Sequence, residues 1–465
     1  MSNQAKYVEY RHRYPTFVYS GYEWRPETDG LHLSFEFRVG DDIVFRPTAF
    51  VPSRPFLSIK HLDKETLDVL VFNIGMAELV SYWKCFCPPL VEVSCGSLTG
   101  EQIAFWKKLY YHGLGEFFYL NGIEATQDDF MTIDALQLAL DSRPMQQLHL
   151  NKNNYLVPIG GGKDSVVTLE ALRTMRKGAT EGIRPLIMNP RGATVGCAER
   201  GGYDVAHTLY IYRTLCPVML EQNRHGCLNG HTPFSAMLAF YTLLALAMSG
   251  EANVALSNES SANESTVLGS SVNHQYSKSF EFEEDFRRYV AEYISPEVRY
   301  FSFLRPLTEL QIASLFARLD QYHDVFRSCN VGSKTDEWCG HCAKCLFAYI
   351  ILSPFLQPTK LQRMFGKDML NESACRREFD QLTGRLPVKP FECVGTVSEV
   401  NAALCMALNR YYCAQPLPVL LRDYQAVDLS TDVEKLLHSL GEESNLNEAE
   451  RSCLQHILQD GEWAD

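Results

Sequence analysis

The sequence predicts an α/β protein with a parallel-sheet core, an N-terminal α+β domain and a helical C-terminal region. Residues 1 to about 60 hold short runs in which apolar and polar residues alternate, as in strands. From residue 154 to about 355, strand-like and helix-like segments alternate, which is typical of a parallel sheet covered by helices. Beyond Pro358 the pattern is mostly helical. We therefore predict domains at 1–145, 146–356 and 357–465.

Composition restricts the function classes. The chain has 465 residues, of which 46% are hydrophobic and 21% charged, as in globular enzymes. A formal net charge of −13 argues against a surface built for nucleic acid, so we expect no nucleic-acid partner. The longest apolar run, 236–248, is too short to cross a bilayer and predicts a buried helix, and the first residues lack the apolar core of a signal peptide. Because fifteen cysteines indicate a reducing compartment, we expect a cytoplasmic protein without membrane insertion, whose oligomeric state the sequence does not specify.

In the N-terminal part, strands are predicted where β-branched and aromatic residues alternate with polar ones, at 16–20, 31–39 and 43–47. Residues 64–82 have a helical period, and 99–114 form another predicted helix that opens with a capping pattern at Thr99 and Gln102. Residues 113–121 are predicted to lead out of this helix at its C-terminal end. For Glu116 and Asn121 within it, a solvated loop and a binding role are equal alternatives.

In the central part, short apolar runs predict successive strands at 155–159, 184–190, 215–220, 253–257 and 299–304. A strongly apolar helix is predicted over 232–248, with Thr232 as its cap and Pro233 at its first position. Two polar segments, 189–200 and 258–266, follow predicted strands. Since ligands of open α/β sheets bind beyond the carboxyl ends of strands, we expect ligand-binding loops there.

The most informative stretch is the glycine-rich turn Gly160-Gly-Gly-Lys-Asp-Ser165, between the first of these strands and a helix. Glycines let an anion approach the backbone N–H groups, and a helix N-terminus favours negative charge. Lys163 adds a cation, Ser165 a hydroxyl donor, and Asp164 a carboxylate suited to Mg²⁺. The spacing matches neither Walker A nor the dinucleotide-binding motif.

A second chemical signal is the group Cys329, Cys339, Cys342 and Cys345. Thiolates two residues apart converge on one tetrahedral ion, so the spacing predicts a metal site, with His341 as a substitute ligand. The alternative is that reduced cysteines pack the start of a helix over 346–356.

The glycine-rich turn resembles the Ser-Gly-Gly-x-Asp-Ser loop of the PP-loop ATP pyrophosphatases, and Gly160 stands where that loop commonly has serine. The resemblance implies a PP-loop, adenine nucleotide alpha hydrolase-like fold and an enzyme that cleaves ATP between its α and β phosphates. It also implies that the loop at Asn189 lies against the base. The cysteine spacing is similar to the zinc knuckle of the PP-loop enzymes that make 7-cyano-7-deazaguanine, which implies structural Zn²⁺.

Together with the segments at Gly113-Leu-Gly-Glu116 and Asn258-Glu-Ser260, these features resemble the UDP-N-acetyl-α-D-muramoyl-L-alanyl-L-glutamate epimerase family of peptidoglycan synthesis. That resemblance implies that the terminal L-Glu of the UDP-muramoyl dipeptide becomes D-Glu through an acyl-adenylate, in a Mg²⁺-dependent reaction that consumes ATP and water and releases AMP and diphosphate. It implies nucleotide contacts from Gly160, Gly161, Gly162, Lys163, Asp164, Ser165, Asn189, Asn258 and Glu259. Lys163 would neutralise the diphosphate and Asp164 would bind the metal.

The acid and base are not specified by a motif. Cys197, Cys227, His225 and His231 are candidates because thiols and imidazoles exchange protons near neutral pH. Arg191, Arg200 and Arg224 are candidate partners for the anionic groups of the substrate.

Two rival functions remain. One is another PP-loop adenylating ligase, either nitrile-forming or tRNA-modifying. The other is a non-catalytic nucleotide-binding scaffold, which the intact Lys163, Asp164 and Ser165 disfavour.

Overall fold

The computed structural model describes residues 1–54, 59, 61–137, 146–411, 416–425, 432–461 and 463. These residues form two compact units, each built from segments that are far apart in the sequence. Unit 1 comprises 1–156, 209–254 and 271–299, and unit 2 comprises 157–208, 255–270 and 300–465. The predicted domain limit at 145 lies outside the described residues, as do Tyr412, where one C-terminal helix is predicted to end (398–412), and Thr431, where another is predicted to begin (431–440). The division into three domains stays a prediction.

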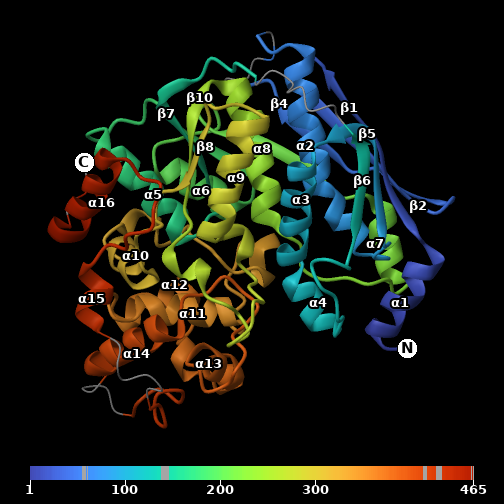
Figure 1. Cartoon of the computed structure of the whole chain (residues 1–465). Coiled ribbons are helices and arrows are strands. Elements are labelled where there is room, and N and C mark those ends of the chain that lie inside the picture. Colours follow the sequence, from blue (N-terminus) through green and yellow to red (C-terminus); the bar gives the residue numbers. More distant parts are fainter. Residues whose placement is uncertain are drawn as a thin grey trace. The chain divides into compact units, whose positions relative to one another are not determined.

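The elements of unit 1 are α1 (Asn3–Arg13), β1 (Thr16–Pro26), β2 (Gly30–Val39), β3 (Ile43–Phe45), β4 (Thr48–Pro52), α2 (Lys64–Trp83), β5 (Leu90–Leu98), α3 (Gly100–Gly113), α4 (Gly115–Asn121), β6 (Thr132–Gln137), β9 (Leu209–Thr214), α7 (Pro217–Arg224), α8 (Phe234–Ser249) and α9 (Phe280–Tyr293) (Figure 1). Three strands carry residues of both units: β7 (Asn151–Pro158), β10 (Glu251–Leu256) and β11 (Arg299–Ser302).

The sheet of unit 1 is mixed, with the strand order β9-β4-β2-β1-β5-β6 and β3 on β2. The strands from β9 to β1 pair antiparallel, whereas β1, β5 and β6 pair in parallel. Alternate side chains of β2, from Leu31 to Val39, are buried, as expected for a strand with one face on the core. Helix α2, buried along nearly its whole length, packs on β1 and α8.

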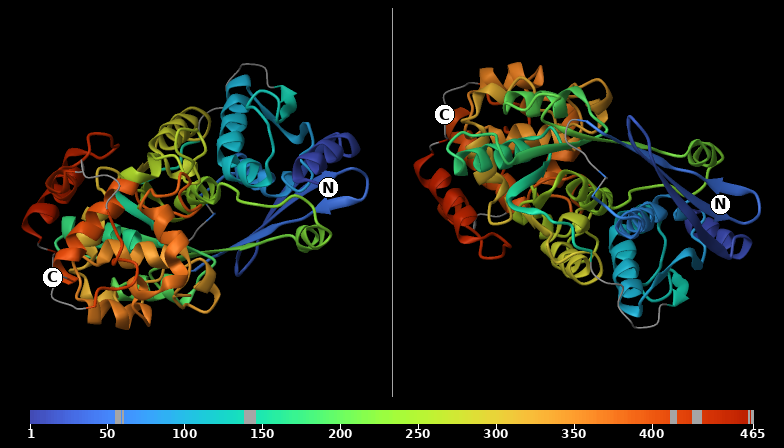
Figure 2. Two further views of the ribbon diagram at one scale, coloured as in Figure 1. Left: turned by 90° about the horizontal axis from the view of Figure 1, so that it is seen from below. Right: turned by 90° about the horizontal axis from the view of Figure 1, so that it is seen from above.

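Unit 2 contains α5 (Lys163–Met175), β8 (Ile183–Met188), α6 (Gly192–Arg200), α10 (Glu309–Phe316), α11 (Ala343–Leu352), α12 (Pro358–Phe365), α13 (Arg376–Leu382), α14 (Val397–Tyr411), α15 (Val433–His438) and α16 (Glu448–Asp460). The strand order is β11-β10-β7-β8, with β10 parallel to β7 and buried at every residue. Helix α10 packs against α5, α11, α14 and α15, and the orange and red helices of this unit lie together in each view (Figure 1, Figure 2).

The α/β class and most predicted elements are confirmed. The helix predicted at 64–82 is α2, and the one at 99–114 is α3. The predicted capping pattern forms, because Thr99 Oγ1 accepts the N–H of Gln102 at 3.2 Å while Gln102 Oε1 accepts the N–H of Thr99 at 3.0 Å. Within the described ranges, no helix has both the length and the apolar character needed to span a bilayer.

Several local predictions are wrong. Residues 215–220 are not a strand: the third strand is β9, and Pro217 begins helix α7, since its fixed φ suits the first helical position and it cannot donate to a ladder. The apolar helix α8 begins at Phe234, so its cap is Pro233 rather than Thr232. The polar segment 189–200 is a loop only up to Arg191, and α6 follows.

Besides α6 and α7, the helices α1, α4 and α9 were not predicted from the sequence. Helix α1 is largely polar, so it lacks the apolar period by which helices are recognised. Helix α4 occupies residues predicted as a helix exit, and it contains both Glu116 and Asn121. Neither residue belongs to a solvated loop, because Asn121 bonds to Phe117 and Asn3, while Glu116 contacts two histidines.

Candidate nucleotide-loop and cysteine sites

The glycine-rich loop joins β7 to α5 in unit 2. Ile159, at the end of the strand, donates its N–H to the carbonyl of Leu186 in the neighbouring strand at 2.8 Å. Gly162 is the N-cap of α5 and no side chain caps the helix, while Ser165 Oγ donates to the carbonyl of Gly162 at 3.0 Å. The N–H groups of the first turn have no intrahelical acceptors, so this helix end is a site for an anion.

Gly161 is fixed by its surroundings. Its φ of +80° lies in the left-handed region, and its carbonyl accepts the N–H of Arg327 at 2.8 Å. A Cβ on Gly161 would come within 3.0 Å of the backbone N of Thr194 at the start of α6, whereas a Cβ on Gly160 would meet nothing within 4 Å. The middle glycine is therefore required by backbone geometry and close packing, and the first is not.

Lys163 stands at the centre of a buried charge cluster. Its ammonium group pairs with the carboxylates of Asp164 and of Glu309, which is the first residue of α10. Burial opposes the lysine charge, but the two carboxylates outweigh it and raise the pKa of Lys163 above its ordinary value. Lys163 therefore remains a cation at neutral pH.

Further carboxylates surround this lysine. Burial, together with the charges of Asp164, Glu259 and Glu399, raises the pKa of Glu309 well above its ordinary value, against the attraction of Lys163. The N–H of Glu309 also donates to Glu399 Oε1 at 2.7 Å. The cluster thus holds more carboxyl groups than cations, which suits an additional cation or an electropositive ligand.

Glu309 and Glu399 were not predicted from the sequence as site residues. Glu399 accepts from the N–H of Thr396 at 2.7 Å, so its sequence pattern is that of a helix cap. Glu309 likewise follows Thr308 at the start of a helix, where an acidic residue is common.

The loops after β8 and β10 hold the other predicted nucleotide residues. Asn189 is exposed and has a positive φ of 51°. Asn258 Nδ2 donates to Ser302 Oγ at 3.0 Å. Glu259 is buried, and its carboxylate accepts from Ser261 Oγ at 2.9 Å. Asn258 and Glu259 are thus held in fixed orientations by their own neighbours.

The four predicted cysteine ligands converge. Three Sγ–Sγ distances are 3.9 Å (Cys329–Cys342), 3.7 Å (Cys339–Cys345) and 3.4 Å (Cys342–Cys345), and all four sulfur atoms lie within 4.8 Å of one another. A zinc ion about 2.3 Å from each sulfur requires edges of about 3.8 Å, so the arrangement fits a tetrahedral ion. Hydrogen bonding from Cys345, together with the neighbouring groups and against burial, lowers the pKa of Cys342 to about 5.

The cysteine segment also supports the glycine-rich loop. It begins beside Arg327, whose N–H binds the carbonyl of Gly161. Asp336, between the first two cysteines, accepts the N–H groups of Gly192 and Ala193 at 2.9 Å each and so occupies the N-terminus of α6. Since α6 contacts Gly161, the conformations of the cysteine segment and the glycine-rich loop depend on each other.

The acid/base candidates belong to both units. In unit 2, Cys197 is buried in α6 with its Sγ 3.6 Å from the carbonyl of Gly161, and burial raises its pKa to about 12. In unit 1, a hydrogen bond with Cys85 and the charges of Lys84 and Lys6 lower the pKa of Cys227, against burial. Burial, His274 and two lysines lower the pKa of His231, also in unit 1, to about 3.

The remaining polar candidates lie on surfaces. His225 and Arg224 are exposed at the end of α7, and Arg191 is exposed before α6. Arg200 pairs with Asp324 at 2.8 Å, and both side chains are about half exposed. His341 is exposed, and its Nδ1 lies 2.9 Å from the carbonyl oxygen of Cys339, outside the group of four sulfurs.

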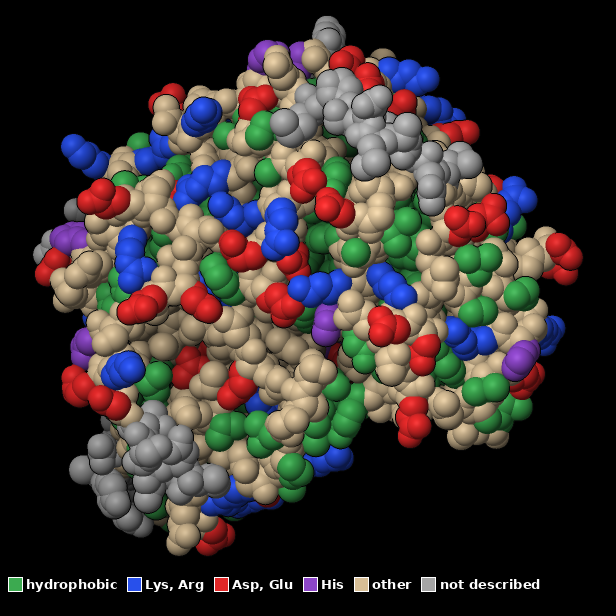
Figure 3. All heavy atoms as spheres, in the orientation of Figure 1, with side chains coloured by type: hydrophobic (Ala, Val, Ile, Leu, Met, Phe, Trp, Pro, Cys, Tyr) green, Lys and Arg blue, Asp and Glu red, His purple; other side chains and the backbone are tan. Residues whose placement is uncertain are grey.

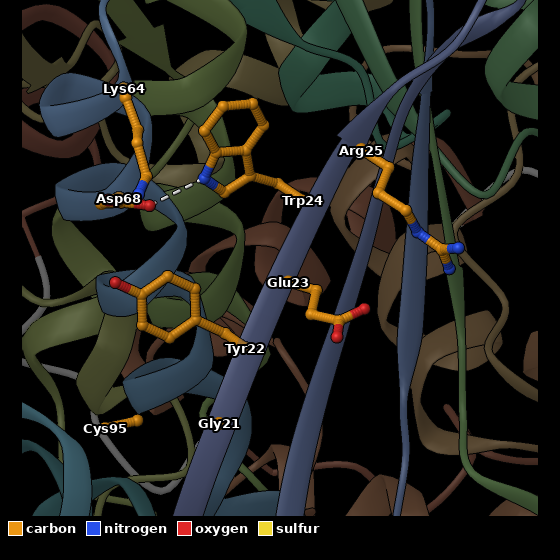
Figure 4. Close-up of a pocket in the computed structure, with 8 residues that line it drawn as sticks. All are labelled: Gly21, Tyr22, Glu23, Trp24, Arg25, Lys64, Asp68 and Cys95. Atoms are coloured by element: carbon orange, nitrogen blue, oxygen red, sulfur yellow. Dashed lines mark hydrogen bonds between the residues drawn. The ribbon is translucent and has the colours of Figure 1, made fainter.

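Unit 1 has a separate open cavity of about 630 Å³ between β1 and the start of α2. Figure 4 shows Tyr22 and Trp24 pointing from β1 toward Lys64 and Asp68 on α2, with Trp24 Nε1 bonded to Asp68 Oδ1 at 2.8 Å. Its volume falls within the range of small-molecule sites, and its aromatic and charged groups suit a flat polar ligand.

Positive side chains do not gather into a single patch on the face drawn in Figure 3, where Lys and Arg alternate with Asp and Glu. A mixed surface of this kind attracts polyanions weakly. The absence of a nucleic-acid partner stays a prediction that this distribution supports.

Together, these observations define an α/β protein with a glycine-rich loop at the carboxyl end of a strand, followed by a helix whose N-terminus no side chain caps and whose first residue is the buried Lys163. Comparison with known proteins identifies the family. Residues 8–303 match the MurL N-terminal domain and residues 325–435 match the MurL C-terminal domain. The chain therefore belongs to the MurL family.

Three relatives carry the name UDP-N-acetyl-alpha-D-muramoyl-L-alanyl-L-glutamate epimerase. The protein of Xanthomonas oryzae pv. oryzae is 34% identical over 410 residues, which cover 86% of this chain and 87% of the relative. Those of a Micromonospora species and of Salinispora tropica are each 33% identical over 70% of this chain, and the matches cover 72% and 70% of the relatives. No solved structure matches the chain.

The geometry of the loop predicts unequal effects of two glycine substitutions. In Gly161→Ala the new Cβ meets the α6 backbone at a left-handed φ, so we expect the free energy of unfolding to fall by about 1–2 kcal/mol and ATP binding to be lost. Gly160→Ala, the matched control, should retain stability and binding. Thermal denaturation and calorimetric titration with ATP measure both effects. Equal behaviour of the two variants would contradict the conclusion that the loop requires glycine at position 161 but not at position 160.

Proposed function

We propose that the chain is an ATP-dependent epimerase that converts the terminal L-Glu of UDP-N-acetylmuramoyl-L-alanyl-L-glutamate to D-Glu in cytoplasmic peptidoglycan synthesis. The observation that carries the proposal is similarity along 86% of this chain to a protein named for that epimerisation. The N-terminus of α5, which no side chain caps and which holds a buried lysine, gives independent support for an anionic cosubstrate.

The proposed fold of the nucleotide domain is that of the PP-loop ATP pyrophosphatases. Support comes from the glycine loop between a parallel strand and a helix, and from the polar residues after β8 and β10. In this arrangement Gly160, Gly161, Gly162 and Ser165 cradle the diphosphate end of ATP, while Asn189, Asn258 and Glu259 contact the rest of the nucleotide.

Activation of the substrate explains why an epimerase would consume ATP. A carboxylate makes the adjacent Cα–H a very weak acid, because deprotonation would place a second negative charge beside the first. Conversion to an acyl-adenylate removes that charge and lets the resulting enolate delocalise. We take the α-carboxylate as the activated group, since it adjoins the proton to be removed. Its oxygen attacks the α-phosphorus of ATP and diphosphate leaves; after epimerisation, water attacks the acyl carbon and releases AMP.

Lys163 and the carboxylates around it fit this step. The ammonium of Lys163 stabilises charge that develops on the departing diphosphate. Asp164 is partly exposed at the helix start and, with the acidic excess around Glu309, offers the oxygen ligands that Mg²⁺ prefers. When bound, Mg²⁺ would supply further charge stabilisation there.

Cys197, Cys227 and His231 remain the proposed proton-transfer residues. The lowered pKa of Cys227 favours its thiolate, which is the form that accepts a proton, whereas the pKa of about 3 leaves the imidazole of His231 neutral and weakly basic. Cys197, whose pKa is raised to about 12, is equipped to donate one.

The cavity of unit 1 is the proposed site for the uridine end of the substrate. Uracil is a flat ring with polar edges, and the cavity offers the aromatic faces of Tyr22 and Trp24 beside the polar groups of Lys64 and Asp68. A stacked base contributes about 1–3 kcal/mol.

Incubation with ATP and UDP-N-acetylmuramoyl-L-alanyl-L-glutamate should yield D-Glu, AMP and diphosphate. Chiral analysis of hydrolysed glutamate and chromatography of the nucleotides measure the products.

Asp164→Ala should lower kcat/KM by about 100-fold or more because metal and charge stabilisation are lost. Glu181→Ala changes an exposed acid of the same unit and should leave kcat/KM unchanged. Release of ADP would refute the mechanism. Turnover without the dipeptide substrate would favour another adenylating ligase, and binding without turnover would favour a scaffold.

The cysteine cluster is the proposed site of one structural Zn²⁺. The variant Cys342→Ser, Cys345→Ser should lose one equivalent of zinc by elemental analysis and bind ATP more weakly, because the same segment holds Gly161 through Arg327. The double variant Cys405→Ser, Cys453→Ser, outside the cluster, should keep the metal. Retention of zinc by the first variant would show that the cysteines only pack.

Trp24→Ala should raise KM for the UDP-linked substrate about 5- to 150-fold through loss of stacking, with KM for ATP unchanged. Tyr212→Ala removes another exposed aromatic side chain of unit 1 and serves as the control. Steady-state kinetics with each substrate varied separately provide the measurement. An unchanged KM for the UDP-linked substrate would exclude the cavity as the uridine site.

A further inference from the structure

A second group of metal-ligating side chains lies in unit 1. Glu116 of α4, His231 and His274 come from three segments that are distant in sequence. Glu116 Oε2 lies 2.5 Å from His274 Nδ1 and 3.6 Å from His231 Nδ1, and the two imidazole rings are 4.4 Å apart. One ligand atom from each residue lies within 4.8 Å of the others.

The surroundings hold this geometry in place. A Cβ on Gly113 would lie 2.6 Å from the ring of Pro233, and one on Gly230 would lie 3.1 Å from Phe117, so the two glycines allow the segment around His231 to approach α4 closely. Asn121 Nδ2 donates to the carbonyl of Asn229 at 3.1 Å and fixes the same segment from the other end of α4.

The donor set is chemically distinct from the cysteine cluster. Two imidazoles and one carboxylate form the ligand set of open sites for first-row divalent metals, whereas four thiolates close a structural zinc site. The side chains of Glu116 and His274 are each 11% exposed and that of His231 is 23% exposed, so the group is partly shielded but reachable.

The charges at this site favour an anion as a further ligand of the metal. One carboxylate leaves a divalent ion with a net positive charge, and the ammonium groups of Lys84 and Lys278 act on His231 in the same direction. An anion in the open coordination position would balance these charges.

We propose that Glu116, His231 and His274 form an open binding site for a first-row divalent metal whose remaining position takes an anionic ligand, a carboxylate or a phosphate. In this site His231 is a metal ligand in place of the proton-transfer role proposed for it above, and the site carries its metal in the absence of nucleotide.

Cobalt substitution of the full chain tests the proposal without ATP or substrate. Protein stripped of metal with a chelator and titrated with Co²⁺ should bind two equivalents. One gives the intense near-ultraviolet thiolate-to-cobalt absorption of the cysteine cluster, and the other gives only weak visible bands of nitrogen and oxygen ligation. Inorganic phosphate should shift the weak bands alone.

The variants His274→Ala and Glu116→Gln should weaken binding of the second equivalent about 100-fold or more and leave the thiolate absorption unchanged. His225→Ala, which changes an exposed histidine of the same unit, should bind both equivalents. Glu116→Gln nearly preserves shape, so it keeps the test decisive if His274→Ala does not fold. Binding of a single thiolate-ligated cobalt, or a second equivalent that both variants retain, would overturn the site and show Glu116 and His274 to be only a hydrogen-bonded pair.

Discussion

The ion pair between Lys163 and Glu309 is the interaction on which the nucleotide loop depends. A charge buried this deeply is tolerated only when it is paired, and the loss of either partner would leave the other uncompensated. The pair joins the first residue of α5 to the first residue of α10, and α10 in turn packs on α11, α14 and α15. The helical C-terminal part of unit 2 thus acts on the loop through α10, although it contains no recognisable motif of its own.

The cysteine segment fixes the other side of the loop. Arg327 donates its backbone N–H to the carbonyl of Gly161, and the Asp336 carboxylate accepts two backbone N–H groups of α6, so the geometry of these bonds depends on how the segment folds. The convergence of the four thiols therefore affects the conformation of the glycine-rich loop and also creates a possible metal site. The adenylation proposed above would require phosphate-binding groups that are set in place before reaction, and contacts on two sides of one loop meet this need.

Features contained in a short stretch could be predicted from the sequence. The turn from Gly160 to Ser165 and the four cysteines each carry their chemistry locally, and the structure places them as expected. Glu309 could not be predicted as a partner of Lys163 because 146 residues separate them, and His274 lies 158 residues from Glu116. Glu309 lies in a helix-capping pattern and His274 in a polar loop, and such patterns occur in most proteins without indicating a site. The error at Leu215 had a local cause: apolar residues before a proline suit a strand end and a helix start equally well.

The central claim is that ATP converts a substrate carboxylate into an acyl-adenylate held at this loop. Transfer of oxygen tests it most directly. When the terminal glutamate of the UDP-linked substrate carries ¹⁸O in its α-carboxylate, attack on ATP followed by hydrolysis at the acyl carbon places one labelled oxygen in AMP. Mass spectrometry of the nucleotides should therefore find ¹⁸O in AMP and none in diphosphate, and labelled AMP should not form with Gly161→Ala. AMP free of label, produced at the rate of epimerisation, would contradict the account.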